Sequence, residues 1–144
     1  MAACFFDTSA LVKRFHKEHG SDTIHKMIES TDNTLVIASI TLSEMTSAFR
    51  KKTNTGVIRE DELQKILSEF SIEIVDKFVI LDIERNHINV SQELIVKHNL
   101  RSLDSIQLAV LLNLKDINPM FICADVRLLT AAKNEGINVF NPEA

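Results

Sequence analysis

The chain has 144 residues, of which 45% are hydrophobic and 25% charged, with only 3 glycines and 2 prolines. This length and composition exclude a disordered chain and favour one domain with a full core over residues 1–144. The formal net charge of -4 excludes a global positive field toward nucleic acid or an anionic membrane, so any nucleic-acid contact must be local.

The cysteines and the hydropathy of the chain indicate its compartment. Cys4 and Cys123 lie in separate apolar runs, and one possible pair gives little support for a disulfide framework. No apolar run approaches the roughly 18 residues of a membrane span, and the first residues carry no basic segment like that of a secretory signal. We therefore expect an unprocessed cytoplasmic protein without membrane association.

Apolar runs typical of strands alternate along the chain with segments of helical spacing. This alternation predicts βαβ units and an α/β fold whose mostly parallel sheet is covered on both faces. The predicted strands are 3–6, 35–38, 78–81, 119–124 and 137–140. The predicted helices are 8–19, with Thr8 or Ser9 as cap, 21–28, 39 to about 51–56, 59–70, 88–98, 102–112 and 126–135. The polar stretch 51–56 is expected to end the third of these helices, which forms a hairpin with the fourth that leans out from the sheet.

One predicted helix carries a carboxylate in an otherwise apolar segment. Ser102 is a fair N-cap, and the residues from Leu103 to Leu112 leave almost no polar face, which is typical of a buried helix. Asp104 falls in the first turn, where the helix N-terminus offsets only about 0.3 to 1 kcal/mol of the cost of burying a charge. Taken alone, Asp104 is equally well explained as helix charge at a partly wet end.

Three further acids occur where strands end or helices begin. Asp7 and Asp125 each follow an apolar strand, and Glu44 lies in the first turns of a helix, so all four acids can converge at one edge of the sheet. Clustered carboxylates repel one another, and a hard cation with oxygen ligands, Mg²⁺ or Mn²⁺, is the usual resolution. Zinc is disfavoured, because no cysteine or histidine stands at convincing ligand spacing.

A carboxylate-held Mg²⁺ with open positions suits hydrolysis of a phosphodiester and needs no nucleophilic side chain. A local basic rim would then contact a phosphate backbone, although charge runs are more often simply solvated faces. The candidate rim residues are Lys13, Arg14, Arg50, Lys51, Lys52 and Arg101.

Four segments, 6–12, 39–44, 100–109 and 123–132, resemble in order the motifs of PIN-domain ribonucleases, and the chain length is that of VapC-type toxins of toxin-antitoxin pairs. The resemblance implies a three-layer α/β/α fold with a parallel sheet of about five strands. It also implies a Mg²⁺ or Mn²⁺ site, endonucleolytic cleavage of RNA, homodimers and an antitoxin that blocks the site. By motif match, the catalytic and metal-binding acids are Asp7, Glu44, Asp104 and Asp125.

One position departs from the family pattern. Cys123 stands two residues before the last acid, where the family often has Thr or Ser, and a thiol is a weaker hydrogen-bond donor than a hydroxyl. Thr8 and Ser9 are expected to supply hydroxyls beside the acids. For the dimer, Phe15 and the pair Met27 and Ile28 are candidate contact residues, although at helical spacing they are more often core.

Other functions remain as alternatives. A PIN-like RNA-binding or scaffold module would keep the acids without nuclease activity, and a non-toxin RNA-processing nuclease would share the site. A receiver domain usually has an acidic pair near its first such strand, whereas Cys4, Phe5 and Phe6 include no acid. A haloacid dehalogenase-type phosphatase requires a second Asp where this chain has Ser9. Fold alone does not decide among them.

Overall fold

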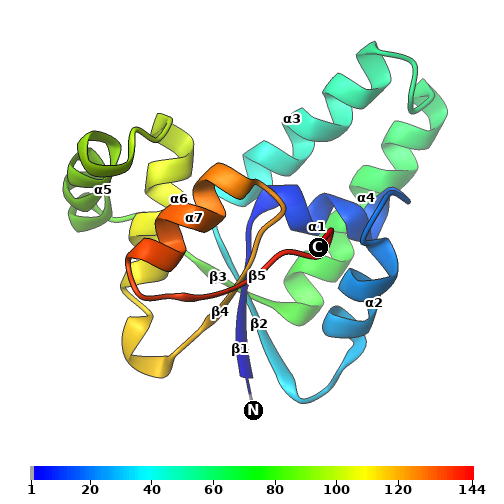
Figure 1. Cartoon of the computed structure of the whole chain (residues 1–144). Helices are drawn as coiled ribbons and strands as arrows, with labels where there is room; N and C mark the ends of the chain where they lie inside the picture. Colours follow the sequence, from blue (N-terminus) through cyan, green and yellow to red (C-terminus); the bar gives the residue numbers. More distant parts are fainter. Residues whose placement is uncertain (1) are drawn as a thin grey trace.

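A computed structural model describes residues 2–144 as a five-stranded parallel sheet with helices on both faces (Figure 1). The strand order is β3-β2-β1-β4-β5, and every neighbouring pair is parallel. The predicted three-layer α/β/α fold is therefore confirmed. The strands are β1 (Ala2–Phe6), β2 (Asn33–Ala38), β3 (Phe78–Leu81), β4 (Met120–Ile122) and β5 (Asn138–Phe140).

The helices lie between and after these strands. In chain order they are α1 (Thr8–Phe15), α2 (Ser21–Glu29), α3 (Ile40–Asn54), α4 (Glu60–Lys77), α5 (Arg85–His98), α6 (Ser102–Leu112), the short 3₁₀ helix η1 (Lys115–Ile117) and α7 (Val126–Asn134). Within residues 2–144, none of them combines the length and apolar character needed to cross a bilayer.

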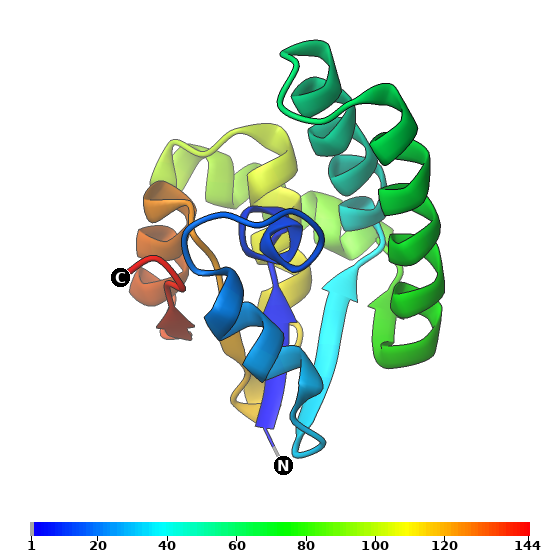
Figure 2. The same ribbon diagram turned by 90° about the vertical axis from the view of Figure 1, so that its right-hand side faces the viewer.

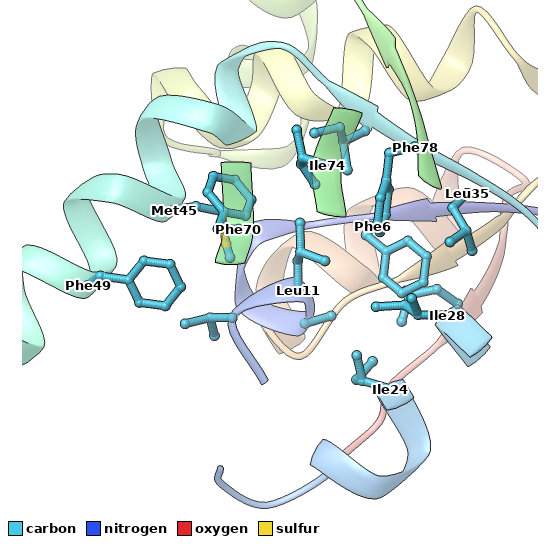
Figure 3. Packing of buried hydrophobic residues seen from close by; sticks show 14 of the residues in the cluster. Phe6, Leu11, Ile24, Ile28, Leu35, Met45, Phe49, Phe70, Ile74 and Phe78 are labelled. Carbon is cyan, nitrogen blue, oxygen red and sulfur yellow. The ribbon is translucent and has the colours of Figure 1, made fainter. Parts of the chain in front are cut away.

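Alternation along the strands divides the core between the two faces of the sheet. Phe6 and Ile37 point to the face covered by α1 to α4, where they meet a cluster that includes Phe49 (Figure 3). Phe5 and Phe121 point to the opposite face and pack against α5 to α7. Both faces of the central strands are thus buried, which explains why these strands read as continuous apolar runs.

The α3 and α4 helices form the predicted hairpin and extend beyond the edge of the sheet (Figure 2). Its base is fixed by three aromatic rings: Phe15 of α1, Phe49 of α3 and Phe70 of α4 meet edge to face with centroid separations of 5.4 to 6.3 Å. Phe15 is therefore a core residue. Ile28 is also buried and Met27 packs against the same cluster, so the prediction that these residues form a dimer face is wrong.

One helix ends where the sequence predicts, and another continues beyond its predicted end. The α3 helix ends at Asn54, inside the polar stretch 51–56, and the Thr53 hydroxyl donates back to the carbonyl oxygen of Phe49. The α4 helix continues to Lys77 because Ile74, four residues after Phe70, is also buried. Tertiary packing of these side chains outweighs the weak helix propensity of the local sequence.

The first prediction tests how much the hairpin of α3 and α4 contributes to the stability of the core. Phe49→Ala should lower the free energy of unfolding by about 3 to 5 kcal/mol, because the ring is fully buried. Phe140→Ala makes the same chemical change on edge strand β5, where the ring is 38% exposed, and should cost much less. Urea unfolding of both variants measures the difference, and equal losses would contradict the packing described here.

Candidate active site

The four predicted acids lie around one end of the sheet. Asp7 follows β1 and Asp125 follows β4, and these strands are neighbours, so their carboxyl ends bring the two residues together. Glu44 enters from the first turns of α3 and Asp104 from the first turn of α6. Each acid thus comes from a different helix start or strand end, as Figure 1 allows the reader to trace.

Asp7 is the most deeply buried of the four, with 5% of its surface exposed. The pKa of its carboxyl is raised to about 6. Burial is the largest cause, hydrogen bonds from Ser9 oppose it, and the nearby charges of Glu44 and Asp104 add to it. Asp7 also caps α1 through its bond from the Ser9 amide, so the predicted capping by Thr8 or Ser9 is wrong.

Ser9 and Cys123 fill the space beside Asp7. The Ser9 hydroxyl donates to Asp7 Oδ2 at 2.6 Å and accepts from the amide of Ala124 at 2.9 Å, which ties the end of β1 to the segment after β4. Cys123 Sγ lies 3.7 Å from Asp7 Oδ2 and 3.4 Å from the carbonyl oxygen of Asp125. Burial and the Asp7 charge raise the pKa of this thiol, so it stays protonated and available as a weak donor.

Glu44 is held by two side chains. Its Oε1 accepts hydrogen bonds from the Thr8 hydroxyl at 3.0 Å and from Nε2 of Gln107 at 2.9 Å. Gln107 is fully buried and also donates to Thr41 Oγ1 at 2.6 Å. Sequence reasoning missed Gln107, although it is the only polar residue from Ile106 to Leu112 and lies three positions after Asp104, hence on the same side of α6.

Arg101 joins the remaining two acids. Its Nε lies 3.1 Å from Asp104 Oδ2, and its Nη2 lies 3.5 Å from Asp125 Oδ2. Arg101, and not Ser102, is the N-cap residue of α6, and it makes no side-chain capping bond. Asp125 caps α7 with its other oxygen, which accepts from the amides at 127 and 128.

The predicted basic rim divides into two groups. Arg101 and Lys51 line a groove of about 700 Å³ beside Glu44 and Asp104, whereas Arg50 is not part of its lining and pairs with Glu60.

Lys13, Arg14 and Lys52 are bound elsewhere. Lys13 is only 2% exposed, with Nζ 2.8 Å from Glu18 and 2.6 Å from Glu143. The other two pair with carboxylates of α2, α4 and the α1–α2 loop: Arg14 with Glu29 and Glu73, and Lys52 with Glu18. The prediction that Lys13 and Arg14 line the rim is therefore wrong, because α1 packs among α2, α3 and α4.

The donor set fits a hard divalent cation. All four side chains offer carboxylate oxygens, which Mg²⁺ and Mn²⁺ prefer. The pKa of Asp7 is raised chiefly by burial and to a smaller extent by the charges of Glu44 and Asp104, and a bound cation would offset both effects. Over residues 2–144, no three acidic, histidine or cysteine side chains are gathered as closely as the ligands of a bound metal. In this arrangement Glu44 contacts Gln107, and Asp104 and Asp125 contact Arg101.

Comparison with known proteins identifies the fold family. The sequence profile of the PIN domain matches residues 4–134, which include all four acids. This chain belongs to the PIN-domain family. A comparison with curated proteins finds no match.

Solved structures share this PIN fold at low sequence identity. PAE2754 from Pyrobaculum aerophilum is 18% identical, with a TM-score of 0.70 over 99% of this chain and 85% of that one. VapBC2 from Rickettsia felis, bound to a DNA fragment from its promoter, is 16% identical with a TM-score of 0.68, covering 96% and 98%. FitAcB from Neisseria gonorrhoeae is 15% identical with a TM-score of 0.67, covering 96% and 97%. At these identities the likeness establishes the fold.

The second prediction concerns pH in the metal-free PIN domain. Asp7 binds its proton more tightly in the folded state, where its pKa is about 6, than in the unfolded state, where it is near 3.8. Its contribution to stability is thus complete below about pH 4 and is lost as pH rises through 6, by about 2 to 3 kcal/mol.

Asp7→Asn supplies the matched comparison, because Asn also caps a helix but does not titrate. Urea unfolding in EDTA from pH 4 to 7 should show the wild type losing stability relative to this variant as pH rises. A constant difference across that range would mean that Asp7 is not held in a desolvated environment.

Proposed function

We propose that this PIN-domain protein is a Mg²⁺- or Mn²⁺-dependent endoribonuclease and the toxin of a toxin-antitoxin pair. Membership of the PIN family supports nuclease activity. The observation that carries the proposal is the placement of Asp7, Glu44, Asp104 and Asp125 around one end of the sheet, with Asp7 buried near the charges of Glu44 and Asp104. Four acids without a nucleophile are suited to hydrolysis by metal-activated water.

The four acids share one task in this proposal, and neighbouring side chains orient two of them. Asp7, Glu44, Asp104 and Asp125 would hold the cation, which when bound supplies an activated water and stabilises charge on the phosphate. Ser9 fixes one oxygen of Asp7, while Thr8 and Gln107 fix one oxygen of Glu44, so both carboxylates are held in a set orientation and each keeps one oxygen without these contacts. Such outer contacts orient metal ligands and contribute to affinity for the metal.

RNA would enter along the groove beside α3. Lys51 and Arg101 line this groove together with the hydroxyls of Ser43 and Ser47, and these groups are suited to a phosphate backbone. Aromatic side chains are absent from its lining within the described residues, so base stacking would contribute little there. We expect binding that depends steeply on salt and weakly on sequence along this groove.

The toxin assignment and the protein partner rest on the structural neighbours. VapBC2 from Rickettsia felis, FitAcB from Neisseria gonorrhoeae and a toxin-antitoxin complex from Klebsiella pneumoniae all share the fold. By analogy, a cognate antitoxin would cover the acid site of this chain in the cytoplasm, where its two free, buried cysteines would remain reduced.

A homodimer is also part of the proposal, through a face that differs from the one expected from sequence. Ile72 and Val75 are 72% and 78% exposed on one side of α4, and Val79, 48% exposed, follows on edge strand β3. Exposed apolar side chains grouped in this way favour a contact between copies.

The third prediction tests this face. Light scattering at tens of micromolar should give a dimer for the wild type and a monomer for Val75→Glu, because a buried unpaired charge opposes association. Val96→Glu on α5, at a position 86% exposed, should remain dimeric. A monomeric wild type would reject the dimer, and dissociation by Val96→Glu alone would move the contact to α5.

The fourth prediction tests the metal site through stability and activity in one protein. In EDTA, Asp104→Asn should be as stable as the wild type or more so, because it relieves repulsion toward Asp7, and an exposed ion pair such as that with Arg101 contributes little. With Mg²⁺ the order should reverse, since the wild type gains more from the bound ion. Cleavage of single-stranded RNA should fall by orders of magnitude.

Asp116→Asn is the control, because it removes the same charge from an exposed position on η1, before β4. Thermal melts with EDTA and with Mg²⁺, together with cleavage assays, give the result. Cleavage that persists after complete removal of metal would refute the mechanism. Metal binding without cleavage of any RNA would favour the scaffold or RNA-binding alternative, and cleavage without a cognate antitoxin would favour an RNA-processing nuclease.

A further inference from the structure

Arg101 occupies the position between two acids of the proposed metal site. Its guanidinium contacts Oδ2 of Asp104 at 3.1 Å and Oδ2 of Asp125 at 3.5 Å, so it joins the first turn of α6 to the first turn of α7. The Arg101 side chain is 76% exposed, whereas those of Asp104 and Asp125 are 16% and 29% exposed. The Arg101 guanidinium thus covers the two carboxylates from the solvent side.

A divalent cation and this guanidinium compete for the same two carboxylates. The N–H groups of Arg101 bond to one oxygen of each acid, and an ion held by Asp104 and Asp125 would place a second positive charge close to the guanidinium, which repels it. Metal that binds Asp104 and Asp125 would therefore weaken the attraction of these acids for Arg101 and favour its release. The displacement is easy, because exposed ion pairs are weak and the side chain is free to move into solvent.

The fold keeps a displaced Arg101 close to the site. Its backbone is the N-cap of α6, immediately after the buried Leu100, so only the side chain is free to turn. The same side chain lines the groove that contains Lys51 and Ser47. When the Arg101 guanidinium leaves the two carboxylates, it stays beside the groove proposed to bind RNA. Its planar set of N–H groups can bind a phosphate as well as a carboxylate.

We propose that Arg101 is an exchangeable counter-ion: it neutralises Asp104 and Asp125 in the metal-free protein and moves to an RNA phosphate when a divalent cation takes those acids. The inference rests on the proposed function and adds a coupling to it. Metal binding frees Arg101 for RNA, and RNA binding draws Arg101 away from the metal ligands. Because such a coupling is reciprocal, each ligand should tighten the other by the same factor.

The fifth prediction separates competition with metal from a general effect of charge. Mn²⁺ binding, measured by titration calorimetry, should be about fivefold or more tighter for Arg101→Ala than for the wild type. Arg127→Ala is the matched control: it removes the same charge from the start of α7, but its guanidinium donates to the carbonyl oxygen of Asn99 and not to an acid. This control should gain much less affinity for Mn²⁺.

The same variants test whether Arg101 moves to an RNA phosphate. Binding of a non-cleavable 2′-O-methyl RNA, followed by fluorescence anisotropy, should tighten when Mn²⁺ is added to the wild type. For Arg101→Ala, binding in Mn²⁺ should be weaker by at least about tenfold and should gain less from the ion. Arg101→Gln keeps an extended polar side chain without the charge and should behave as Arg101→Ala, which guards against a local effect on α6.

The outcomes distinguish a failure of the proposed Arg101 exchange from a failure of the proposed nuclease function. Wild-type protein that binds Mn²⁺ and cleaves RNA, combined with Arg101 variants that bind Mn²⁺ no more tightly than Arg127→Ala, would overturn the exchange and leave the nuclease intact. Tighter Mn²⁺ binding with unchanged RNA affinity would overturn the transfer to phosphate. Wild-type protein that neither binds Mn²⁺ nor cleaves RNA would overturn the proposed function itself.

Discussion

The burial of Asp7 is the constraint on which the rest of the site depends. A carboxylate that is 5% exposed, at the end of a central strand and beside two other acids, requires compensation. The Ser9 hydroxyl and amide supply hydrogen bonds, but these do not cancel the cost, because the pKa still rises to about 6. The sheet fixes the position of the Asp7 carboxylate, and the cation proposed to bind there would offset the remaining cost of its burial.

The surrounding acids differ in how firmly they are held. Glu44 is fixed by Thr8 and by Gln107, whose amide is itself anchored on Thr41 inside the protein. Asp104 and Asp125 are instead balanced by an exposed arginine side chain. One half of the site is therefore preorganised by buried hydrogen bonds, and the other half is closed by an ion pair that solvent can reach. A binding site of this kind admits an ion from the exposed side.

The sequence predicted the sheet, and it pointed to four acids that lie around one end of that sheet, because both inferences depend on local patterns. Apolar runs ending at Asp7 and Asp125, and the carboxylate of Asp104 in an apolar helix, are visible without coordinates. The contact of Gln107 with Glu44 spans 63 positions and depends on how α6 packs beside α3. The bridge made by Arg101 likewise depends on the relative placement of α6 and α7. Such contacts follow from tertiary packing, which no spacing rule encodes.

Lys13 and Arg101 show that the role of a charged residue also depends on tertiary packing. Both occur next to predicted acid motifs, and both were assigned to one basic rim. Lys13 is buried and neutralised by Glu18 and Glu143, which ties α1 to the chain end, so it is not available to a ligand. Arg101 carries the same charge at 76% exposure and can exchange partners at little cost. Burial, and not the charge written in the sequence, decides which cation serves the structure and which can serve the reaction.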